Sequence, residues 1–455
     1  MTARDAQRGV TRRGLLAATG TAALAWAATG RVERAGASDP TPAAPLPGGP
    51  LPVIPELAPD IVDGGAVWTL TEAPLPATAD RAGLVEQPPL AYDGRIPGPI
   101  IRIRDGYPAR VVLQNRSGEI SNLHLHGLRI APAIDRPLIT VPDGGDHTYA
   151  FLQARGHAAT YWYHPHLHGL VEEQMLRGLA GPLLFDPDVL PAQLAGAQEH
   201  VLLLTNQLNT SNLLVNGVPA PQLTADATRV RLRIINASTA RNPTLRLRGP
   251  DGAPRPFWLV ATDGGFLRSP VRATALPFGI GQRVELLVDV SPAASTLYCG
   301  EDGQTIVTLT GPDGPPLPAP AGAMAQVPKL TPTRTTHHRR IDLTQTAEGT
   351  FSIDNKLFSH TRVDQHVRYG ALEVWEVRNR TSVPHPFHLH SWPFQVLSRG
   401  GRKEPFVAWR DTALVHPGET VKLAIRFDKY RGKTVYHCHI AAHEDNGMMG
   451  IVEVH

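Results

Sequence analysis

Short apolar runs, separated by turns that contain glycine or proline, recur along the whole chain, whereas long apolar stretches with helical spacing are few. Such runs between turn residues are typical of β-strands. The 42 Gly and 43 Pro residues agree with many short strands and frequent turns. We therefore predict an all-β fold. The clearest strand-like runs are 110–113, 181–185, 230–235 and 284–288.

The length of the chain indicates several domains. A chain of 455 residues is too long for one hydrophobic core, and about three domains are expected. Strand-like runs fill the ranges 61–188, 193–322 and 333–455, and the breaker-rich stretch 311–332 reads as a linker before the last range. We expect each of the three ranges to form one domain.

Residues 1–37 have the features of a twin-arginine export signal. Arg12 and Arg13 precede an alanine-rich apolar run that ends at Ala28 and is too short to span a bilayer, and 35–37 offers a small-residue cleavage site. Such signals serve chains exported after folding, which suits a protein that must first load a metal. We expect a periplasmic, cell-envelope or secreted protein without a membrane span after signal removal. The proline-rich stretch 38–60 is predicted to be a flexible leader outside the fold.

The charge and the cysteine content exclude two classes of protein. Without the six Arg and two acidic residues that precede Ser38, the formal charge changes from +3 to about −1, so no basic footprint for nucleic acid remains. The chain has two cysteines, Cys299 and Cys438. Because Cys438 is a candidate metal ligand, no disulfide framework is expected, and Cys299 is predicted to be a buried, inert thiol.

The segment 436–449 combines two kinds of copper ligand. In an extended segment, His437 and His439 point to one face and Cys438 points to the other, so one short strand would contact two separate metal sites. A thiolate with two imidazoles and a weak thioether forms a soft, electron-transferring copper site. Cys438, His443 and Met448 supply three of these four groups, and the fourth must come from elsewhere.

Histidines at a spacing of two residues suggest a multinuclear metal site. Two side chains at positions i and i+2 of a strand share a face about 6 to 7 Å apart, so they can chelate one ion or bridge two. A single pair is more often a satisfied histidine doublet or a zinc ligand, but four pairs favour a cluster. No pair lies in the middle range, which we expect to be structural, so the cluster should lie between the first and last domains. His337 and His338 belong to a basic run that we expect to be solvated. The four pairs are His124/His126, His164/His166, His388/His390 and His437/His439, with His385 three residues before the third pair.

These motifs resemble the three-domain multicopper oxidases, the laccases and their bacterial relatives, in the order in which that family carries them. The likeness extends from 92–99 through 215–217 and 261–265 in the middle domain to the C-terminus. It implies three consecutive cupredoxin-like Greek-key sandwiches, four copper ions and a monomer. The motifs are His124-Leu125-His126-Gly127, Trp162-Tyr163-His164-Pro165-His166, His385-Pro386-Phe387-His388-Leu389-His390 and His437-Cys438-His439.

By this resemblance, each expected copper ligand has a counterpart in the chain, whereas a copper-free relative such as the cell-division proteins of this fold should have lost several. The type 1 copper ligands would be His385, Cys438, His443 and, as a long axial ligand, Met448. The type 2 ligands would be His124 and His388. The two type 3 ions would be held by His126, His164 and His439, and by His166, His390 and His437.

The resemblance also implies the chemistry. Dioxygen needs four electrons to become water, whereas donors give one electron at a time, and Cys438 is covalently joined to both His437 and His439, which offers electrons a bonded path. Asp135 and Glu444 stand where bacterial members carry acids that serve the cluster, with a solvated or turn-capping carboxylate as the alternative. His168 would point to the same face as His164 and His166, near the cluster but without binding copper.

The electron donor is the least determined part of the prediction. The choice lies between phenols or aromatic amines and metal ions such as Cu(I), Fe(II) or Mn(II). Five methionines in the chain and the stretch 381–384 before His385, which lacks Asp and Met, disfavour a dedicated Cu(I) site. A methionine axial ligand implies a lower potential and favours electron-rich donors. A copper-binding resistance protein and a structural exported protein with empty sites are the alternatives.

Overall fold

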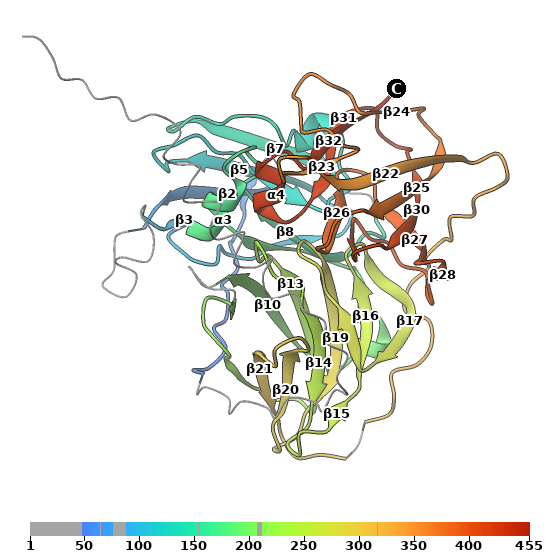
Figure 1. Cartoon of the computed structure of the whole chain (residues 1–455). Coiled ribbons are helices and arrows are strands. Elements are labelled where there is room, and N and C mark those ends of the chain that lie inside the picture. Colours follow the sequence, from blue (N-terminus) through green and yellow to red (C-terminus); the bar gives the residue numbers. More distant parts are fainter. Residues whose placement is uncertain (1–47, 64, 76–87, 153–154, 207–211, 316) are drawn as a thin grey trace, which may run out of the picture. The chain divides into compact units, whose positions relative to one another are not determined.

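The computed structural model describes residues 48–63, 65–75, 88–152, 155–206, 212–315 and 317–455. Strands dominate the described part of the chain, and its helices are short, which confirms the all-β prediction. The strands form three consecutive pairs of sheets, and each pair encloses its own hydrophobic core (Figure 1). The predicted export signal lies outside the described residues.

The first sandwich packs a sheet of order β1-β2-β5-β7, with β3 on β2, against a sheet of order β4-β9-β8-β6. Strand β5 alternates buried and partly exposed residues, as expected for a strand with one face on a core. The elements are β1 (Asp60–Val62), β2 (Gly65–Pro74), β3 (Leu90–Tyr92), β4 (Ile101–Arg104), β5 (Pro108–Asn115), β6 (His124–His126), α2 (Pro132–Asp135), β7 (Asp146–Leu152), β8 (Ala159–His164), α3 (Val171–Arg177) and β9 (Gly181–Asp186).

The middle sandwich has the sheets β11-β10-β13-β19-β16-β17 and β12-β21-β20-β14-β15, with β18 on β14. Both faces of β13 are buried, because Leu232 packs in the core while Arg231 and Arg233 form ion pairs with Glu285 on the other face. The elements are η1 (Ala192–Leu194), β10 (Gln198–Asn206), β11 (Leu213–Val215), β12 (Gln222–Thr224), β13 (Arg229–Asn236), β14 (Thr244–Arg248), β15 (Pro254–Arg255), β16 (Phe257–Thr262), β17 (Gly265–Ala273), β18 (Ala275–Pro277), β19 (Arg283–Asp289), β20 (Ser295–Cys299) and β21 (Thr305–Thr310).

The third sandwich has the sheets β23-β22-β25-β30-β27-β28 and β24-β32-β31-β26-β29. Asp445, at the end of its helix α4, accepts hydrogen bonds from the backbone N–H groups of Gly169 (2.8 Å) and Glu172 (2.8 Å), so the first and third sandwiches are joined at α3. The elements are β22 (His337–Gln345), β23 (Phe351–Ile353), β24 (Gln365–Val367), β25 (Leu372–Asn379), β26 (His385–Leu389), β27 (Phe394–Arg399), β28 (Arg402–Lys403), β29 (Thr412–Val415), β30 (Thr420–Arg426), β31 (Gly432–Cys438), α4 (Ala441–Asp445) and β32 (Met449–Val454).

The three sandwiches share one topology. In the first sheet of each, the second strand pairs in parallel with the third, as β2 with β5, β10 with β13, and β22 with β25. In the second sheet of each, a parallel pair is followed by two antiparallel partners, as in β9-β8-β6 and β32-β31-β26. Strands β6 and β8 of the first sandwich therefore correspond to β26 and β31 of the third.

The leader prediction is wrong for its described part, residues 48–60. Ile54 is buried in a cluster between sandwiches, and Leu51 packs against the middle core. Proline lacks an N–H group but keeps its carbonyl acceptor. Accordingly, Pro52 O accepts from Asn216 Nδ2 (2.9 Å) and Pro55 O accepts from Ile100 N (2.8 Å). A proline-rich composition suggested flexibility, whereas these residues form an extended strap across two sandwiches.

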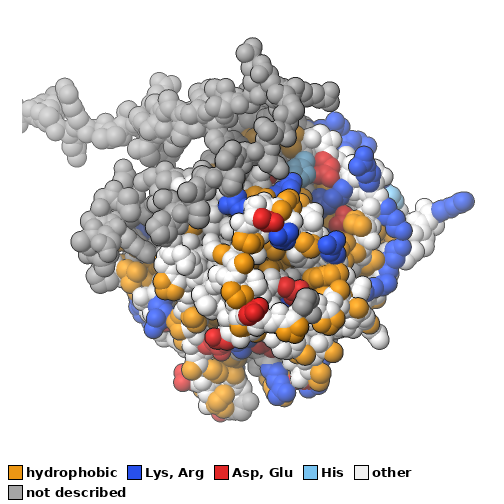
Figure 2. Space-filling view, turned by 90° about the horizontal axis from the view of Figure 1, so that it is seen from below, with side chains coloured by type: hydrophobic (Ala, Val, Ile, Leu, Met, Phe, Trp, Pro, Cys, Tyr) orange, Lys and Arg blue, Asp and Glu red, His pale blue; other side chains and the backbone are white. Residues whose placement is uncertain are grey.

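One face of the molecule carries side chains of mixed character (Figure 2). Figure 2 shows one face on which acidic, basic and hydrophobic side chains are interspersed, with several Lys and Arg side chains along one edge. Among the residues that the structure describes, no helix has the length and apolar composition needed to cross a bilayer.

Burial of the Glu72 side chain should make the stability of the fold depend on pH. Burial raises the pKa of Glu72 to about 7, although Ser121 donates a hydrogen bond to its carboxylate (2.9 Å). The folded state therefore binds more protons than the unfolded state between about pH 4.5 and 7, and stability should fall as the pH rises through this window, by on the order of 3 kcal/mol. Glu72→Gln should raise the thermal midpoint at pH 8 and leave it unchanged at pH 4.5.

The control is Glu173→Gln, which alters a partly exposed carboxylate on α3. Thermal melts of both variants across this pH range measure the effect. An equal change for Glu72→Gln at both pH values would contradict the assignment.

Candidate metal centres

The structure brings His385, Cys438 and His443 together in the third sandwich. Their ligand atoms lie within 4.8 Å of one another. His385 Nδ1 is 3.4 Å from Cys438 Sγ, and His443 Nδ1 is 3.6 Å from the same sulfur. Met448 is fully buried in the same core cluster as Cys438, and its carbonyl accepts a hydrogen bond from Cys438 N (3.1 Å).

The surroundings of this site suit a thiophilic cation. Burial raises the pKa of the Cys438 thiol, and burial lowers the pKa of His385 to about 3 and that of His443 to about 4. The imidazoles are therefore neutral ligands, and a bound cation would supply the charge that ionises the thiol. Thr381 Oγ1 lies 2.7 Å from His385 Nε2 and so leaves Nδ1 to face the sulfur. Of the three ligands, only His443 is partly exposed.

Strand register aligns the histidine pairs of the second site. His124 on β6 lies directly opposite His164 on β8, and His388 on β26 lies opposite His437 on β31. The structure joins the two halves at the contact of the first and third sandwiches, where eight imidazoles converge and are almost completely buried. They are His124, His126, His164, His166, His388, His390, His437 and His439.

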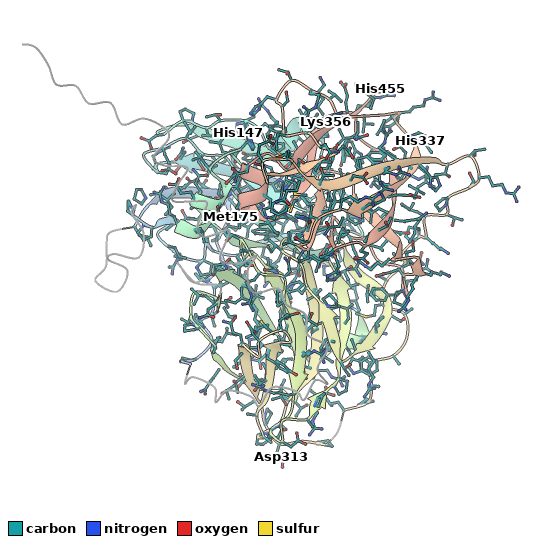
Figure 3. All side chains as sticks on the ribbon, in the orientation of Figure 1. His147, Met175, Asp313, His337, Lys356 and His455 are labelled. Carbon is teal, nitrogen blue, oxygen red and sulfur yellow. The ribbon has the colours of Figure 1, made fainter. Side chains whose placement is uncertain are left out.

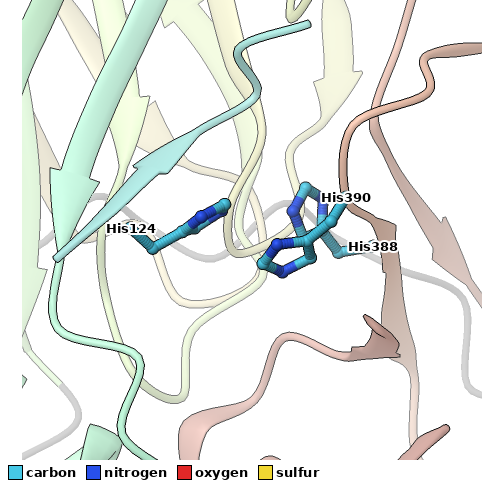
Figure 4. A group of neighbouring side chains, drawn as sticks. All are labelled: His124, His388 and His390. Atoms are coloured by element: carbon cyan, nitrogen blue, oxygen red, sulfur yellow. The ribbon is translucent and has the colours of Figure 1, made fainter. Parts of the chain in front are cut away.

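The imidazole nitrogens of this group form several compact sets. His390 Nε2 and His166 Nε2 lie 3.1 and 3.2 Å from His437 Nε2. His439 Nε2 lies 3.1 Å from His126 Nδ1. Figure 4 shows His124, His388 and His390 converging from the two sandwiches, and their ligand atoms also lie within 4.8 Å of one another.

These nitrogens fit a metal cluster better than satisfied histidine doublets. The Nε2 atoms of His124, His164 and His388 are buried and have no hydrogen-bond partner. Burial, followed by the neighbouring imidazoles, holds the pKa of His124 well below its usual range. A buried polar group without a partner is unfavourable, whereas a neutral imidazole nitrogen is a good ligand for copper. The donor set therefore fits the predicted copper cluster.

Three buried carboxylates surround the cluster, and each bridges the two sandwiches. Asp135 lies 2.7 Å from both His124 Nδ1 and His390 Nδ1. Glu444 lies 3.0 Å from His437 Nδ1 and 3.3 Å from His166 Nε2. Burial raises the pKa of Glu444, but the charges of His437 and His166 outweigh burial, so its net pKa is lowered.

Sequence reasoning missed the third carboxylate, Asp411, which lies 3.2 Å from His126 Nε2 and 3.5 Å from His388 Nδ1. Burial raises its pKa, but the Arg283 guanidinium outweighs burial and holds the pKa well below its usual range. Asp411 stands 21 positions after His390 and Arg283 lies in the middle domain, so no spacing signal marked either residue. The middle sandwich has no histidine ligand among the described residues, yet it reaches the cluster.

The remaining sequence predictions concern residues outside the two sites. Cys299 is buried, and burial raises the pKa of its thiol to about 12, as expected for an inert thiol. His337 and His338 are exposed at the start of β22, as predicted, and Figure 3 labels His337 at this edge of the third sandwich. His168 is partly buried, and its ring packs against Phe358 (4.8 Å between centroids) outside the metal-ligand groups found among the described residues.

Comparison with known proteins agrees with this geometry. Two multicopper oxidase family models match residues 76–189 and 327–455, which together make up more than half of the chain. The chain is 28% identical over 393 residues to the multicopper oxidase mco of Staphylococcus haemolyticus, which covers 80% of this chain and 83% of that protein. A laccase structure from Pediococcus acidilactici is 27% identical, with a TM-score of 0.78, and covers 90% of this chain and 95% of that chain. A Campylobacter jejuni multicopper oxidase, described as a metallo-oxidase, is 26% identical, with a TM-score of 0.76 over 90% of this chain and 96% of its own.

The chain belongs to the multicopper oxidase family. It is therefore a copper-dependent oxidoreductase that oxidises a donor and uses oxygen as the acceptor. Copper is the metal that the family implies, and the two buried sites have the ligand chemistry to hold it.

The contacts of Asp135 with two imidazoles should affect copper binding at the cluster. A carboxylate can accept hydrogen bonds from both Nδ1–H groups, whereas an amide offers one acceptor oxygen and would direct its NH₂ group at the other ring. Asp135→Asn should therefore lower copper affinity at the cluster about tenfold or more, as is typical for lost partners of ligand histidines. Copper content during titration with a chelator measures this effect. Asp146→Asn, an exposed carboxylate on β7, is the control, and equal retention by both variants would argue against the role.

Proposed function

We propose that this protein couples four one-electron oxidations at a type 1 copper to the four-electron reduction of dioxygen to water at a trinuclear copper cluster. His385, Cys438 and His443, with Met448 as axial ligand, would hold the type 1 ion. His124 and His388 would hold the type 2 ion. The two type 3 ions would be bound by His126, His164 and His439, and by His166, His390 and His437.

The single observation that carries this proposal is the position of Cys438 between the two sites. Its sulfur lies within 3.6 Å of imidazole nitrogens of the first site, and its backbone joins His437 and His439 of the second. Copper, when bound, supplies the one-electron redox chemistry that the side chains lack. The protein contributes the short covalent connection, the fixed spacing and the burial of the ligands, of which only His443 is partly exposed.

Reduction of oxygen to water also consumes protons, and Glu444 and Asp135 are the proposed groups that handle them. Both carboxylates are buried and contact imidazoles of both sandwiches. The Glu444 carboxylate lies 3.0 Å from His437 Nδ1 and 3.3 Å from His166 Nε2, a position from which it can take up a proton and pass it on. The alternative was an ordinary carboxylate solvated at the surface. Burial of both side chains argues against it.

We propose an electron-rich phenol or aromatic amine as the donor, with a metal ion as the alternative. The ring centroids of Phe351 and of His443, the partly exposed ligand, are 4.1 Å apart. An aromatic donor would therefore meet an apolar, aromatic surface there. Three of the four described methionines are buried, and the partly exposed Met324 packs in a cluster of the middle sandwich. The similar proteins include both a laccase and a metallo-oxidase.

The alternative function is a copper-binding resistance protein whose oxidase activity is incidental. A Met- and His-rich tract for weak copper binding would favour it, and the sequence has none. We also propose export through the twin-arginine-type signal at 1–37 and a monomeric protein. Export before copper loading, or a stable oligomer in solution, would contradict these two proposals.

Cys438→Ser should abolish the blue absorption and the oxygen consumption together, because the variant lacks the thiolate of the proposed type 1 site. His124→Ala should keep the blue absorption and lose oxygen reduction, because it removes a nitrogen of the other site. Absorption spectra and oxygen uptake measure both. Cys299→Ser changes a buried thiol that lies outside both groups and serves as the control. Turnover by Cys438→Ser would refute the proposed path, as would fewer than about two coppers per native chain.

The donor is tested by oxygen uptake of the wild-type protein with 2,6-dimethoxyphenol, Cu(I) and Fe(II). We expect the highest kcat/KM for the phenol, because the described surface lacks exposed methionine ligands for Cu(I). A higher kcat/KM for Cu(I) would replace the proposed donor with a metal ion and leave the oxidase reaction itself in place.

A further inference from the structure

Arg283 connects all three sandwiches at the edge of the histidine cluster. It is the first residue of β19 and is completely buried. A guanidinium has five N–H donors, and each of them has an acceptor here. The acceptors are Thr160 O of the first sandwich (3.0 Å), Gly281 O (2.7 Å) and Asp263 O (3.1 Å) of the middle one, and Asp411 Oδ1 (2.7 Å) and Oδ2 (2.5 Å) of the third.

Asp411 in turn sets the orientation of two imidazoles. Its Oδ1 faces His126 Nε2 at 3.2 Å, which leaves His126 Nδ1 to face the cluster. Its backbone carbonyl accepts from His388 Nδ1 (2.9 Å), and the unpartnered His388 Nε2 is left for a metal. The hydrogen bond on one ring nitrogen determines which nitrogen can bind a metal. Asp411 therefore fixes the ligand atom of one histidine from each outer sandwich.

Two glycines allow close packing here, Gly127 beside the Arg283–Asp411 pair and Gly281 beside the histidine cluster. A Cβ atom on Gly127 would lie 2.3 Å from Arg283 Nη2 and 2.6 Å from Asp411 Oδ2. A Cβ atom on Gly281 would lie 2.8 Å from the ring of His439. Both glycines have a positive φ, +89° and +82°, which other residues rarely adopt. At Gly281 the backbone of the middle sandwich thus lies directly against the ring of His439.

Asp135 and Asp411 occupy corresponding positions but differ in their support. The pairs His124/His126 and His388/His390 are each shared between the two carboxylates. Asp135 contacts His124 and His390. Asp411 contacts the other member of each pair, His126 and His388. The ion pairs of Asp135 among the described residues are with imidazoles alone, whereas Asp411 has the two-pronged contact with Arg283. A guanidinium that holds both carboxylate oxygens restricts rotation of that carboxylate.

We propose that Arg283 is a positioning residue for the copper cluster, through which the middle sandwich holds Asp411 against His126 and His388. This inference rests on the proposed function, because it assigns these two histidines to copper. It gives the middle sandwich, which supplies no histidine ligand among the described residues, a direct part in copper retention and oxygen reduction.

The test compares Arg283→Gln with Arg233→Gln. Arg233 is equally buried and also joins the first and middle sandwiches, through Thr160 Oγ1 (2.8 Å) and Asp186 (2.8 Å), but it does not contact a carboxylate of the cluster. A loss of sandwich packing alone would affect both variants alike. Copper per chain, the type 2 electron paramagnetic resonance signal, the blue absorption, the thermal midpoint and the KM for oxygen are measured for each.

We expect Arg283→Gln to keep the blue absorption, to lose much of its type 2 signal and to reduce oxygen turnover about tenfold to 100-fold. Arg283→Lys should fall between wild type and Arg283→Gln, because an ammonium keeps the charge but lacks the planar fork. Arg233→Gln should lower the thermal midpoint and leave the type 2 signal per chain unchanged. Equal type 2 signals and oxygen KM values in Arg283→Gln and Arg233→Gln would overturn the proposal.

A double-variant cycle tests whether Arg283 acts through Asp411. If it does, Arg283→Gln combined with Asp411→Asn should cost no more turnover than Asp411→Asn alone, whereas independent effects would multiply. Multiplied losses would overturn the proposed route through Asp411. A wild-type protein without copper or oxygen consumption would instead refute the proposed function, so the two failures are distinguishable.

Discussion

The structure depends on one constraint: eight imidazoles from both ends of the chain must be buried together with several of their nitrogens unpaired. Buried polar groups without partners are unfavourable, so something other than the histidines has to hold the two sandwiches in this contact. The carboxylates of Asp135, Asp411 and Glu444 do so, since each lies between an imidazole of the first sandwich and one of the third. The side chains that orient the ligands are therefore also part of the interface between the sandwiches.

The repeated topology explains how this arrangement arises from one chain. Strands β6 and β8 correspond to β26 and β31, so the four histidine pairs lie on or directly after equivalent strands of two sandwiches that face each other. In the middle sandwich the equivalent of β31 is β20, and it ends at Cys299 where β31 ends at Cys438. Among the described residues, Cys299 belongs to no group of metal ligands, so the same fold position holds a thiol without a site.

Much of the fold and of the grouping of the candidate ligands could be predicted from the sequence because both are encoded locally. A spacing of two residues in an extended segment fixes the side-chain face, so the alternation of His437, Cys438 and His439 is enough to place Cys438 on one side and the two histidines on the other. The strap at 48–60 could not be predicted, because proline content says nothing about whether Ile54 finds a buried place. The roles of Asp411 and Arg283 could not be predicted either, because they depend on a contact between two residues that are 128 positions apart in the sequence.

That long-range contact changes how the middle sandwich should be regarded. A domain that only separated the other two could have any surface at their junction, provided that it packed well. Instead it presents Gly281 against His439 and places the guanidinium of Arg283 on the carboxylate that faces His126. A buried, fully satisfied network of this kind specifies one relative placement of its parts, because any shift leaves charged groups unpaired. The geometry of the metal site is thus set by three domains, although two supply all its proposed ligands.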